Sequence, residues 1–229
     1  MRIGIISDVH SNNYALQKLF EQEKEITYWL CAGDTVGLFP NVNETVELMQ
    51  AHNVVSIAGD HEYYLLNNEL MQHSFSGNDS IQKQRQTVTQ TNFQLIKQLK
   101  QTETVIKEGK KIHLTHALLY TKPDFSDAEK YLYDWRVIEK KYAAFDIVVS
   151  GHNHLPSIYY GKEVIFINPG SLGFPIGKWA RPSYCIFDTD DNTCQFKYLG
   201  FDHEQLIADI EKMNYNKGYI NYLNNNFIW

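Results

Sequence analysis

The chain has 229 residues, of which 43% are hydrophobic and 21% are charged, and its formal net charge is −6 at pH 7. This length suits one large domain that can bury a substantial core, and the composition is that of an ordinary globular protein. The acidic balance argues against a surface built to bind polymeric nucleic acid. An anionic substrate would need cations at the site itself.

The first residues become polar too early for the apolar region of a signal peptide. No apolar run approaches the roughly 20 residues that a membrane-spanning helix needs. Cys31, Cys185 and Cys194 are odd in number, far apart in sequence and in no C-x-x-C pair, which argues against a disulfide framework or a thiolate zinc site. We therefore expect a cytoplasmic protein with no membrane partner.

The first two thirds of the chain alternates short β-branched runs with helical patterns, which favours a sheet flanked by helices. Strands are expected at residues 2–6, 27–31, 54–58, 111–115 and 146–149. Helices are expected at residues 12–24 and 43–51, and in a Gln-rich segment with apolar positions from Ile81 to Leu99.

Ser126-Asp127-Ala128-Glu129 has the spacing of a capping box, which predicts a helix from there to about Tyr142. After residue 157 the pattern changes to strands separated by turns, at residues 158–160, 164–167, 184–187 and 195–198. The block 202–213 predicts a helix with Asp202 as its N-cap. No repeat or linker is evident, so we expect a single domain over residues 1–229.

Five of the nine histidines lie in short polar clusters that follow the predicted strands. In chain order the clusters are Asp8-Val9-His10, Gly33-Asp34, Gly59-Asp60-His61-Glu62, Thr115-His116 and Gly151-His152-Asn153-His154. The carboxyl ends of parallel strands share one edge of a sheet, so these clusters should converge. Each cluster alone is compatible with a turn or a buried histidine, but together they predict a metal site.

Residues two apart on an extended chain point to the same side. We therefore expect Asp8 and His10 to face one ion together, and His152 and His154 to reach into the same space. The glycines at 33, 59 and 151 are expected to let the backbone turn sharply where each strand ends.

In order and strand placement, the five clusters resemble the motif set of the calcineurin-like metallophosphoesterases. The set spans residues 8 to 154, and Asn168-Pro169-Gly170-Ser171 resembles a segment common in the small bacterial and archaeal phosphodiesterase branch. This resemblance implies an α/β fold, a four-layer α-β-β-α sandwich of mixed sheets with flanking helices. Residues 63–101 and 117–141 would be helical cap elements that fold over the sheet edge and select the leaving group.

The family pattern also implies two metal ions and the residues that hold them. The first ion would be held by Asp8, His10, Asp34 and His154, and the second by Asp34 as the bridge, Asp60, His116 and His152. Because the ligands are oxygens and imidazoles with no thiolate, we expect divalent or transition ions, manganese first, with iron, zinc, nickel or cobalt as alternatives. His61 matches the catalytic histidine that assists the leaving group or the transition state, and Glu62 matches the acidic residue that orients its neighbours.

Asp60 stands where the family pattern normally carries asparagine. With three carboxylates ionised, two divalent ions leave a net charge of about +1, whereas asparagine would leave about +2. We expect tighter metal retention, weaker attraction for a phosphate anion and a less acidic bridging water. A protonated Asp60 or a trivalent ion are the alternatives.

The ligands and the resemblance predict a hydrolase that cleaves phosphate esters, above all phosphodiesters. Two nearby cations polarise the phosphoryl oxygens, acidify a bridging water and support an in-line displacement, and His61 assists. The alternatives are a dinucleoside polyphosphate hydrolase of the diadenosine tetraphosphate type and a non-catalytic protein-binding scaffold that resembles a eukaryotic retromer subunit. The expected partner is a small phosphorylated substrate, and the oligomeric state stays open.

Other side chains have two interpretations each. Lys178 and Arg181 are phosphate contacts or solvated surface charges. Tyr63 and Tyr64 stack on a nucleobase or pack as early residues of a helix. The aromatic tail, which includes Tyr215, Tyr219, Tyr222, Phe227 and Trp229, packs on its own domain, which we favour, or forms a subunit contact.

Overall fold

The computed structural model describes residues 1–69, 71, 75–128, 133–176, 181–201, 203–215 and 217–226. The strands are β1 Arg2–Ile6, β2 Trp29–Cys31, β3 Val55–Ser56, β4 Thr102–Lys107, β5 Lys110–Thr115, β6 Ile147–Val149, β7 Ser157–Tyr160, β8 Ile165–Asn168, β9 Ser183–Asp188 and β10 Thr193–Tyr198. The helices are α1 Asn13–Gln22, α2 Val42–Ala51, α3 Asp60–Asn67, α4 Phe75–Thr87, α5 Gln90–Lys97, α6 Trp135–Tyr142, α7 Glu204–Lys212 and α8 Lys217–Asn226.

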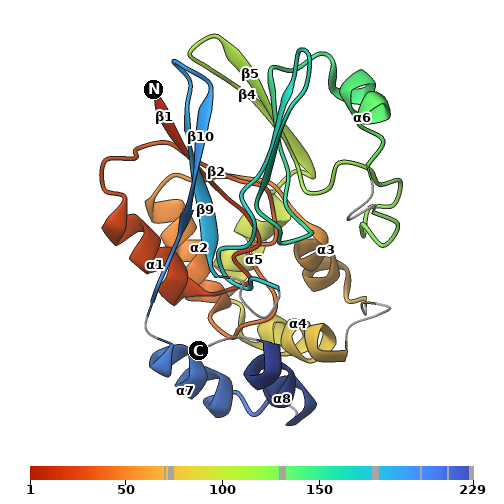
Figure 1. The fold of residues 1–229 in the computed structure, drawn as a ribbon. Coiled ribbons are helices and arrows are strands. Elements are labelled where there is room, and N and C mark those ends of the chain that lie inside the picture. Colours follow the sequence, from red (N-terminus) through yellow and green to blue (C-terminus); the bar gives the residue numbers. More distant parts are fainter. Residues whose placement is uncertain are drawn as a thin grey trace.

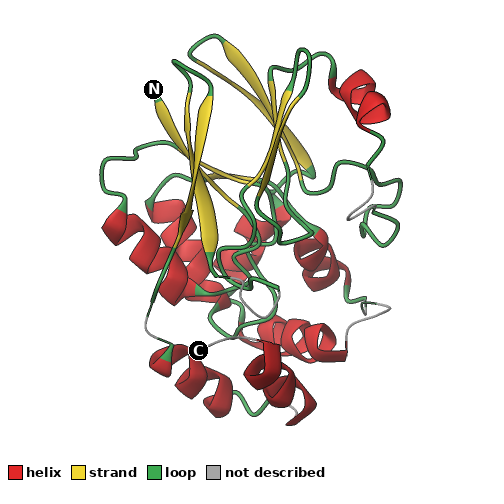
Figure 2. Ribbon diagram, viewed as in Figure 1, coloured by secondary structure: helices red, strands yellow, loops and turns green. Residues whose placement is uncertain are grey.

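The strands form two five-stranded sheets that pack face to face (Figure 2). The first sheet has the order β10-β9-β1-β2-β3, and the second has the order β4-β5-β6-β8-β7. In the first sheet β1, β2 and β3 are parallel, and in the second β5, β6 and β8 are parallel. The remaining pairs are antiparallel, so both sheets are mixed, as expected.

Aliphatic side chains fill the space between the two sheets. Ile5 and Leu30 of the first sheet belong to one cluster with Leu114, Ile147 and Ile167 of the second, and none of the five is more than 1% exposed. Each such side chain stabilises the fold by roughly 1.5–3 kcal/mol relative to an exposed position. This shared core holds the two carboxyl edges in a fixed relation.

Helices cover the outer face of each sheet (Figure 1). On the first sheet, Leu16 and Leu19 of α1 and Met49 of α2 pack with Trp29. On the second, Ile138 of α6 packs with residues of β6 and β8. The layers therefore follow the α-β-β-α order that the resemblance implied. No helix among the described residues is both long and apolar enough to cross a membrane.

The strand β4 was not expected, because its residues mix polar and apolar types without a buried face. It is an edge strand that pairs with β5 along its whole length. Glu108 and Gly109 join the two strands with φ angles of 47° and 75°. Two consecutive positive φ angles are typical of the tight turn of a β-hairpin, and the Glu-Gly pair was the available signal.

The helix predicted from Ser126 to about Tyr142 ends where expected, but its predicted start is wrong. Residues 126–128 form a turn, and α6 begins at Trp135 with Asp134 as its N-cap. The Asp127 carboxylate accepts hydrogen bonds from the backbone N–H groups of Thr121 (3.0 Å) and Lys122 (3.1 Å), so it closes a loop instead of starting a helix. Glu129 lies outside the described residues.

The Gln-rich segment is helical, as predicted, but it forms two helices. Thr89 separates α4 from α5, and its hydroxyl accepts a hydrogen bond from the Asn92 N–H as the N-cap of α5. Near the C-terminus, Tyr215 and Tyr219 are 4% and 1% exposed and pack with Leu206, which confirms self-packing for this part of the tail. Asp202, Phe227 and Trp229 are not among the described residues, and the Tyr222 side chain is not described.

Two cysteines lie closer together than their separation in sequence indicated. Cys185 on β9 and Cys194 on the neighbouring β10 have Sγ atoms 2.7 Å apart, and both are free thiols. The antiparallel pairing of the two strands brings them together.

We expect Ile167→Ala to lower the free energy of unfolding by about 2–5 kcal/mol, because it leaves a cavity between the sheets. Ile106→Ala is the control, since Ile106 is 71% exposed on β4, and it should change stability by less than about 0.5 kcal/mol. Urea denaturation followed by circular dichroism measures both. Equal effects of the two substitutions would contradict a core between the sheets.

Candidate metal centre

The seven predicted metal ligands lie together where the parallel strands of both sheets end. The loops after β1 and β2 supply Asp8, His10 and Asp34, and Asp60 is the first residue of α3. The loops after β5 and β6 supply the other three histidines. Ligand atoms of these residues form overlapping groups whose members all lie within 4.8 Å of one another. The convergence predicted from strand order therefore holds, but two sheets share the edge instead of one.

The first group contains Asp8, His10 and His154. The Nε2 atoms of the two imidazoles are 3.1 Å apart, and Asp8 Oδ1 lies 3.2 Å from His154 Nε2 and 3.9 Å from His10 Nε2. His154 Nδ1 donates a hydrogen bond to the carbonyl of Phe174. That bond leaves Nε2 of the neutral ring as a lone-pair donor, the state in which histidine binds a metal.

The second group contains Asp60, His116 and His152. Asp60 Oδ1 lies 2.9 Å from His116 Nε2 and 3.0 Å from His152 Nδ1, and these two nitrogens are 3.3 Å apart. His116 Nδ1 donates to the Ala32 carbonyl at 2.7 Å, so its Nε2 is also available as a ligand.

Asp34 lies between the two groups. Its Oδ2 atom is 3.4 Å from His116 Nε2 and 3.9 Å from His10 Nε2, so one oxygen faces a histidine of each group. Its Oδ1 atom accepts a hydrogen bond from the His61 backbone N–H at 3.0 Å, which fixes the orientation of the carboxylate. This is the position that a bridging ligand requires.

His61 borders the same cluster. Its Nε2 atom is 4.0 Å from Asp34 Oδ2, and its ring centre is 4.5 Å from that of His10. Burial lowers the pKa of His61 to about 4, although the Asp60 carboxylate opposes the shift. His61 also forms a group with His10 and Asp34 that could hold an ion, so its catalytic role stays a prediction.

The backbone at the predicted ligands differs from the extended chain that we expected. Five of them have positive φ angles: Asp8 (53°), His10 (52°), Asp34 (53°), His152 (70°) and His154 (61°). The left-handed region costs a residue other than glycine on the order of 1–3 kcal/mol. The two-residue spacing correctly predicted that Asp8 lies near His10 and that His152 and His154 both reach the ligand cluster. The reason was wrong, because the backbone at these residues is not extended.

Backbone hydrogen bonds between the loops hold this strained geometry. The Asp8 N–H donates to the Gly33 carbonyl at 3.0 Å, and the His10 N–H donates to the Asp34 carbonyl at 2.9 Å. The Gly151 N–H donates to the His116 carbonyl at 2.9 Å. Each ligand loop is thus fixed by its neighbour across the sheet edge.

The glycines of the motifs serve two different purposes. Gly33 has a φ of 96°, as expected for a sharp turn. Gly59 and Gly151 do not have positive φ angles, and close contact explains them instead. A Cβ atom at Gly59 would lie 2.2 Å from Asp34 Oδ1, and one at Gly151 would lie 1.9 Å from Ser7 Oγ.

Glu62 orients its neighbours, as the resemblance implied. It is fully buried, and its carboxylate accepts hydrogen bonds from the backbone N–H groups of Asp34 (3.0 Å), Val36 (3.0 Å) and Gly59 (2.7 Å). The Gly59 bond is the return bond of a helix capping box, because Glu62 is the third residue of α3. One side chain thereby joins the loop after β2 to the start of α3.

Three supporting residues were missed in the sequence. Gln84 of α4 is fully buried, accepts from the Gly37 N–H at 3.0 Å and donates to Ser11 Oγ at 3.0 Å. Its spacing from Ile81 and Val88 was the available signal for an inward position. The Phe125 ring centre lies 5.3 Å from that of His116, and Ser171 Oγ donates to the Asp8 carbonyl at 2.7 Å.

The structure also bears on Tyr64 and on one of the two basic residues for which the sequence left two interpretations. Tyr64 is 5% exposed and packs in the cluster around Val36, Val42 and Leu65, which supports the packing interpretation. Arg181 is exposed, and Lys178 lies outside the described residues.

The ionisable groups of the site shift one another's pKa values. Burial and the Asp60 carboxylate raise the pKa of Asp34 well above its ordinary value. Burial would lower the pKa of His116, but Asp34 and Asp60 together raise it well above the usual range. A carboxylate that resists ionisation beside an imidazole that takes up a proton indicates a surplus of negative charge, which bound cations would neutralise. The donor set therefore fits metal ions.

The chain belongs to the calcineurin-like phosphoesterase superfamily, whose domain model matches residues 1–192. It is 29% identical over 231 residues to protein MJ0912 of Methanocaldococcus jannaschii, with 92% of each chain covered. The fold is similar to that of the hypothetical protein PH1004 from Pyrococcus horikoshii OT3, with a TM-score of 0.86, 15% identity and 97% of each chain covered. It is also similar to a metallophosphoesterase from Sphaerobacter thermophilus, with a TM-score of 0.75, 22% identity and 98% of each chain covered.

We expect Glu62→Gln to lower the free energy of unfolding by about 1–3 kcal/mol, because the amide N–H₂ cannot accept the backbone N–H bonds that the carboxylate accepts. The matched control is Glu163→Gln at an exposed position, which should leave stability within about 0.5 kcal/mol of the parent. Urea denaturation of the metal-free proteins measures both. A Glu62→Gln protein as stable as its control would show that these bonds do not hold the loops.

Proposed function

We propose that the protein is a binuclear metal-dependent phosphodiesterase. The observation that carries this proposal is the position of Asp34, whose carboxylate lies between one group of imidazole and carboxylate ligands and another. In each group two ring nitrogens face each other at 3.1 Å or 3.3 Å beside a carboxylate oxygen. A divalent ion can bind both nitrogens and the carboxylate oxygen of a group at once, whereas a single proton joins only two of these atoms.

Under this proposal one ion would be held by Asp8, His10, Asp34 and His154, and the other by Asp34, Asp60, His116 and His152. Manganese is the ion we would test first, followed by iron, zinc, nickel and cobalt, because oxygen and imidazole ligands suit all of them. Bound ions would polarise the phosphoryl group and supply an activated water.

The residues of the chain would then hold the ligands in position and assist the reaction. The His61 backbone N–H donates to the Asp34 carboxylate, and the Glu62 carboxylate accepts a hydrogen bond from the Asp34 backbone N–H. These two bonds hold the shared carboxylate before substrate arrives. His61 faces the same cluster and would hydrogen-bond the transferred phosphoryl group or the departing oxygen. The third carboxylate, Asp60, lowers the positive charge of the site, which favours a singly charged diester over a doubly charged monoester.

Residues 63–101 and 117–141 are proposed as the elements that close over the sheet edge. Gln84 of α4 holds the loop at Gly37, and Phe125 packs its ring against His116. Both contacts connect these segments to the ligand loops. Movement of either segment would therefore shift the ligand residues.

We expect the protein to hydrolyse bis(p-nitrophenyl) phosphate when manganese is added, and a chelator to abolish the reaction. His61→Ala should lower kcat about 10²–10⁴-fold while the metal content, measured by mass spectrometry, stays the same. His52→Ala is the control, an exposed histidine at the end of α2, with activity expected within about twofold of the parent.

Absence of hydrolysis with every metal in the series would favour the non-catalytic scaffold. Diadenosine tetraphosphate is included as a second substrate, and a kcat/KM higher for it than for the diester would favour the dinucleoside polyphosphate hydrolase. Loss of the metals from His61→Ala would show that His61 is a ligand.

Two substitutions of Asp60 separate the effect of its charge from the effect of its role as a metal ligand. Asp60→Asn keeps an oxygen where His116 and His152 converge, so we expect both ions to remain and turnover to be unchanged or higher. Asp60→Ala removes the oxygen, and the metal content should fall from two ions to about one. Metal analysis and diester hydrolysis of the two variants test this. An inactive Asp60→Asn protein with both ions bound would overturn the charge argument.

A further inference from the structure

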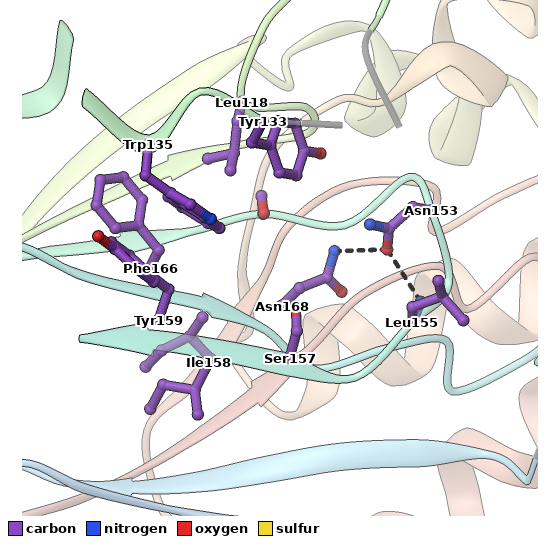
Figure 3. A pocket seen from close by; sticks show the side chains of 12 residues that line it. Leu118, Tyr133, Trp135, Asn153, Leu155, Ser157, Ile158, Tyr159, Phe166 and Asn168 are labelled. Atoms are coloured by element: carbon purple, nitrogen blue, oxygen red, sulfur yellow. Dashed lines mark hydrogen bonds between the residues drawn. The ribbon is translucent and has the colours of Figure 1, made fainter. Parts of the chain in front are cut away.

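A separate cavity lies against the outer face of the second sheet (Figure 3). Its volume is about 400 Å³, which falls in the range of small-molecule sites. Its floor comes from β7 and β8, and Leu118 and Ser150 follow the ends of β5 and β6. The carboxyl ends of parallel strands are where α/β proteins bind ligands.

One end of the cavity is aromatic. Trp135 stacks on Tyr159 with ring centres 3.9 Å apart and planes at 13°, and the ring centres of Phe166 and Tyr133 lie 5.4 Å and 5.5 Å from that of Trp135. All four rings line the cavity, and Tyr133, Trp135 and Tyr159 are only partly buried. A flat ring can therefore add to an existing stack.

The other end carries amides and hydroxyls. Asn168 Nδ2 donates to Asn153 Oδ1 at 3.0 Å, and the Leu155 N–H donates to the same oxygen at 2.9 Å (Figure 3). Asn168 Nδ2 also donates to the Gly151 carbonyl at 2.8 Å. Ser150 and Ser157 line the same region. These bonds fix the polar end in one geometry. They use both N–H bonds of Asn168, whose Oδ1 also accepts from the Gly170 N–H at 2.9 Å.

This polar end shares a loop with the metal centre. Asn153 lies between His152 and His154, whose ring nitrogens face the aspartates on the other side of the loop. Asn168 also ties the loop backbone at Gly151 to the end of β8. One loop thus contributes Asn153 to the cavity and two adjacent histidines to the ligand cluster.

None of the described residues that line the cavity carries a formal charge. Among these residues no cation compensates for the lost hydration of an anion, so they favour an uncharged ligand. A flat, uncharged group with hydrogen-bonding edges has the matching chemistry: its faces meet the rings, and its edges meet Asn153 and the Ser150 and Ser157 hydroxyls. A heteroaromatic base is such a group.

We propose that this cavity binds the nucleobase of a nucleoside phosphodiester whose phosphate lies at the metal centre. The proposal rests on the phosphodiesterase function argued above and deepens it, because it makes the substrate a nucleotide ester. In this proposal the cavity selects among diesters by their base, and the metal centre cleaves the phosphodiester bond.

The test compares two substrates with the same leaving group, the p-nitrophenyl ester of thymidine 5′-phosphate and methyl p-nitrophenyl phosphate. Ser157→Trp and Leu155→Trp each place an indole in the cavity from an exposed position, so the fold should tolerate both. Each variant should raise KM for the thymidine ester about tenfold or more and leave kcat/KM for the methyl ester within about twofold.

Tyr160→Trp is the control, because Tyr160 is exposed on the same strand and does not line the cavity. It should affect neither substrate. Equal kinetics of the parent protein with both esters, or equal loss of both in the two cavity variants, would overturn the base site while leaving the phosphodiesterase intact.

Binding of thymidine alone, measured by quenching of tryptophan fluorescence, keeps the two proposals separate. Thymidine should bind the parent and Tyr160→Trp proteins and bind Ser157→Trp at least about tenfold more weakly. This result would support the base site even if neither ester were hydrolysed. No binding to the parent, together with hydrolysis of both esters at equal rates, would remove the base site and retain the hydrolase.

Discussion

The sharing of the Asp34 carboxylate between two groups of imidazoles is the interaction on which the site depends. One oxygen faces His116 and His10, and the other is occupied by the His61 backbone N–H. In a buried setting this crowding of carboxylates raises the pKa of Asp34 and of His116 together. The charge surplus favours bound cations, and the network of backbone bonds around Asp34 keeps the ligands from separating to relieve it.

The two sheets make this crowding possible. Backbone bonds join the loops after β1 and β2, and others join those after β5 and β6, while the core between the sheets fixes the two sets relative to each other. Positive φ angles at five predicted ligands are maintained because each loop is bonded to the next. The geometry of the centre therefore depends on both sheets. The strained backbone at the ligands is held by hydrogen bonds to residues that are distant in sequence. Gln84 of α4 and Phe125 of the loop between β5 and α6 add support from outside the sheets.

The segment Asp60-His61-Glu62 shows how a local structural role and a functional one coexist. It forms the first turn of α3, and Glu62 makes the return bond of the cap to Gly59. The same three residues place a carboxylate between His116 and His152, an imidazole beside Asp34 and a buried acceptor for the Asp34 loop. A helix start and a site are compatible here, because the first turn of a helix presents its side chains at the edge of the sheet. Asp60 adds a negative charge at that point, beside His116 and His152.

The sequence by itself determined the seven residues that converge and a sheet flanked by helices, because hydrophobic period and strand-end chemistry are local properties. The four-layer arrangement was implied only by the resemblance of the motifs to a known family. The sequence did not determine the helix boundary at Trp135, where Asp127 closes a loop, nor the left-handed backbone at the ligands, which depends on bonds between loops. Only the tertiary structure placed Gln84, Phe125 and the Phe174 carbonyl against the site, since each comes from a segment distant in sequence. The aromatic cavity beside the loop at Asn153 was likewise decided by packing, because its walls come from three separate parts of the chain.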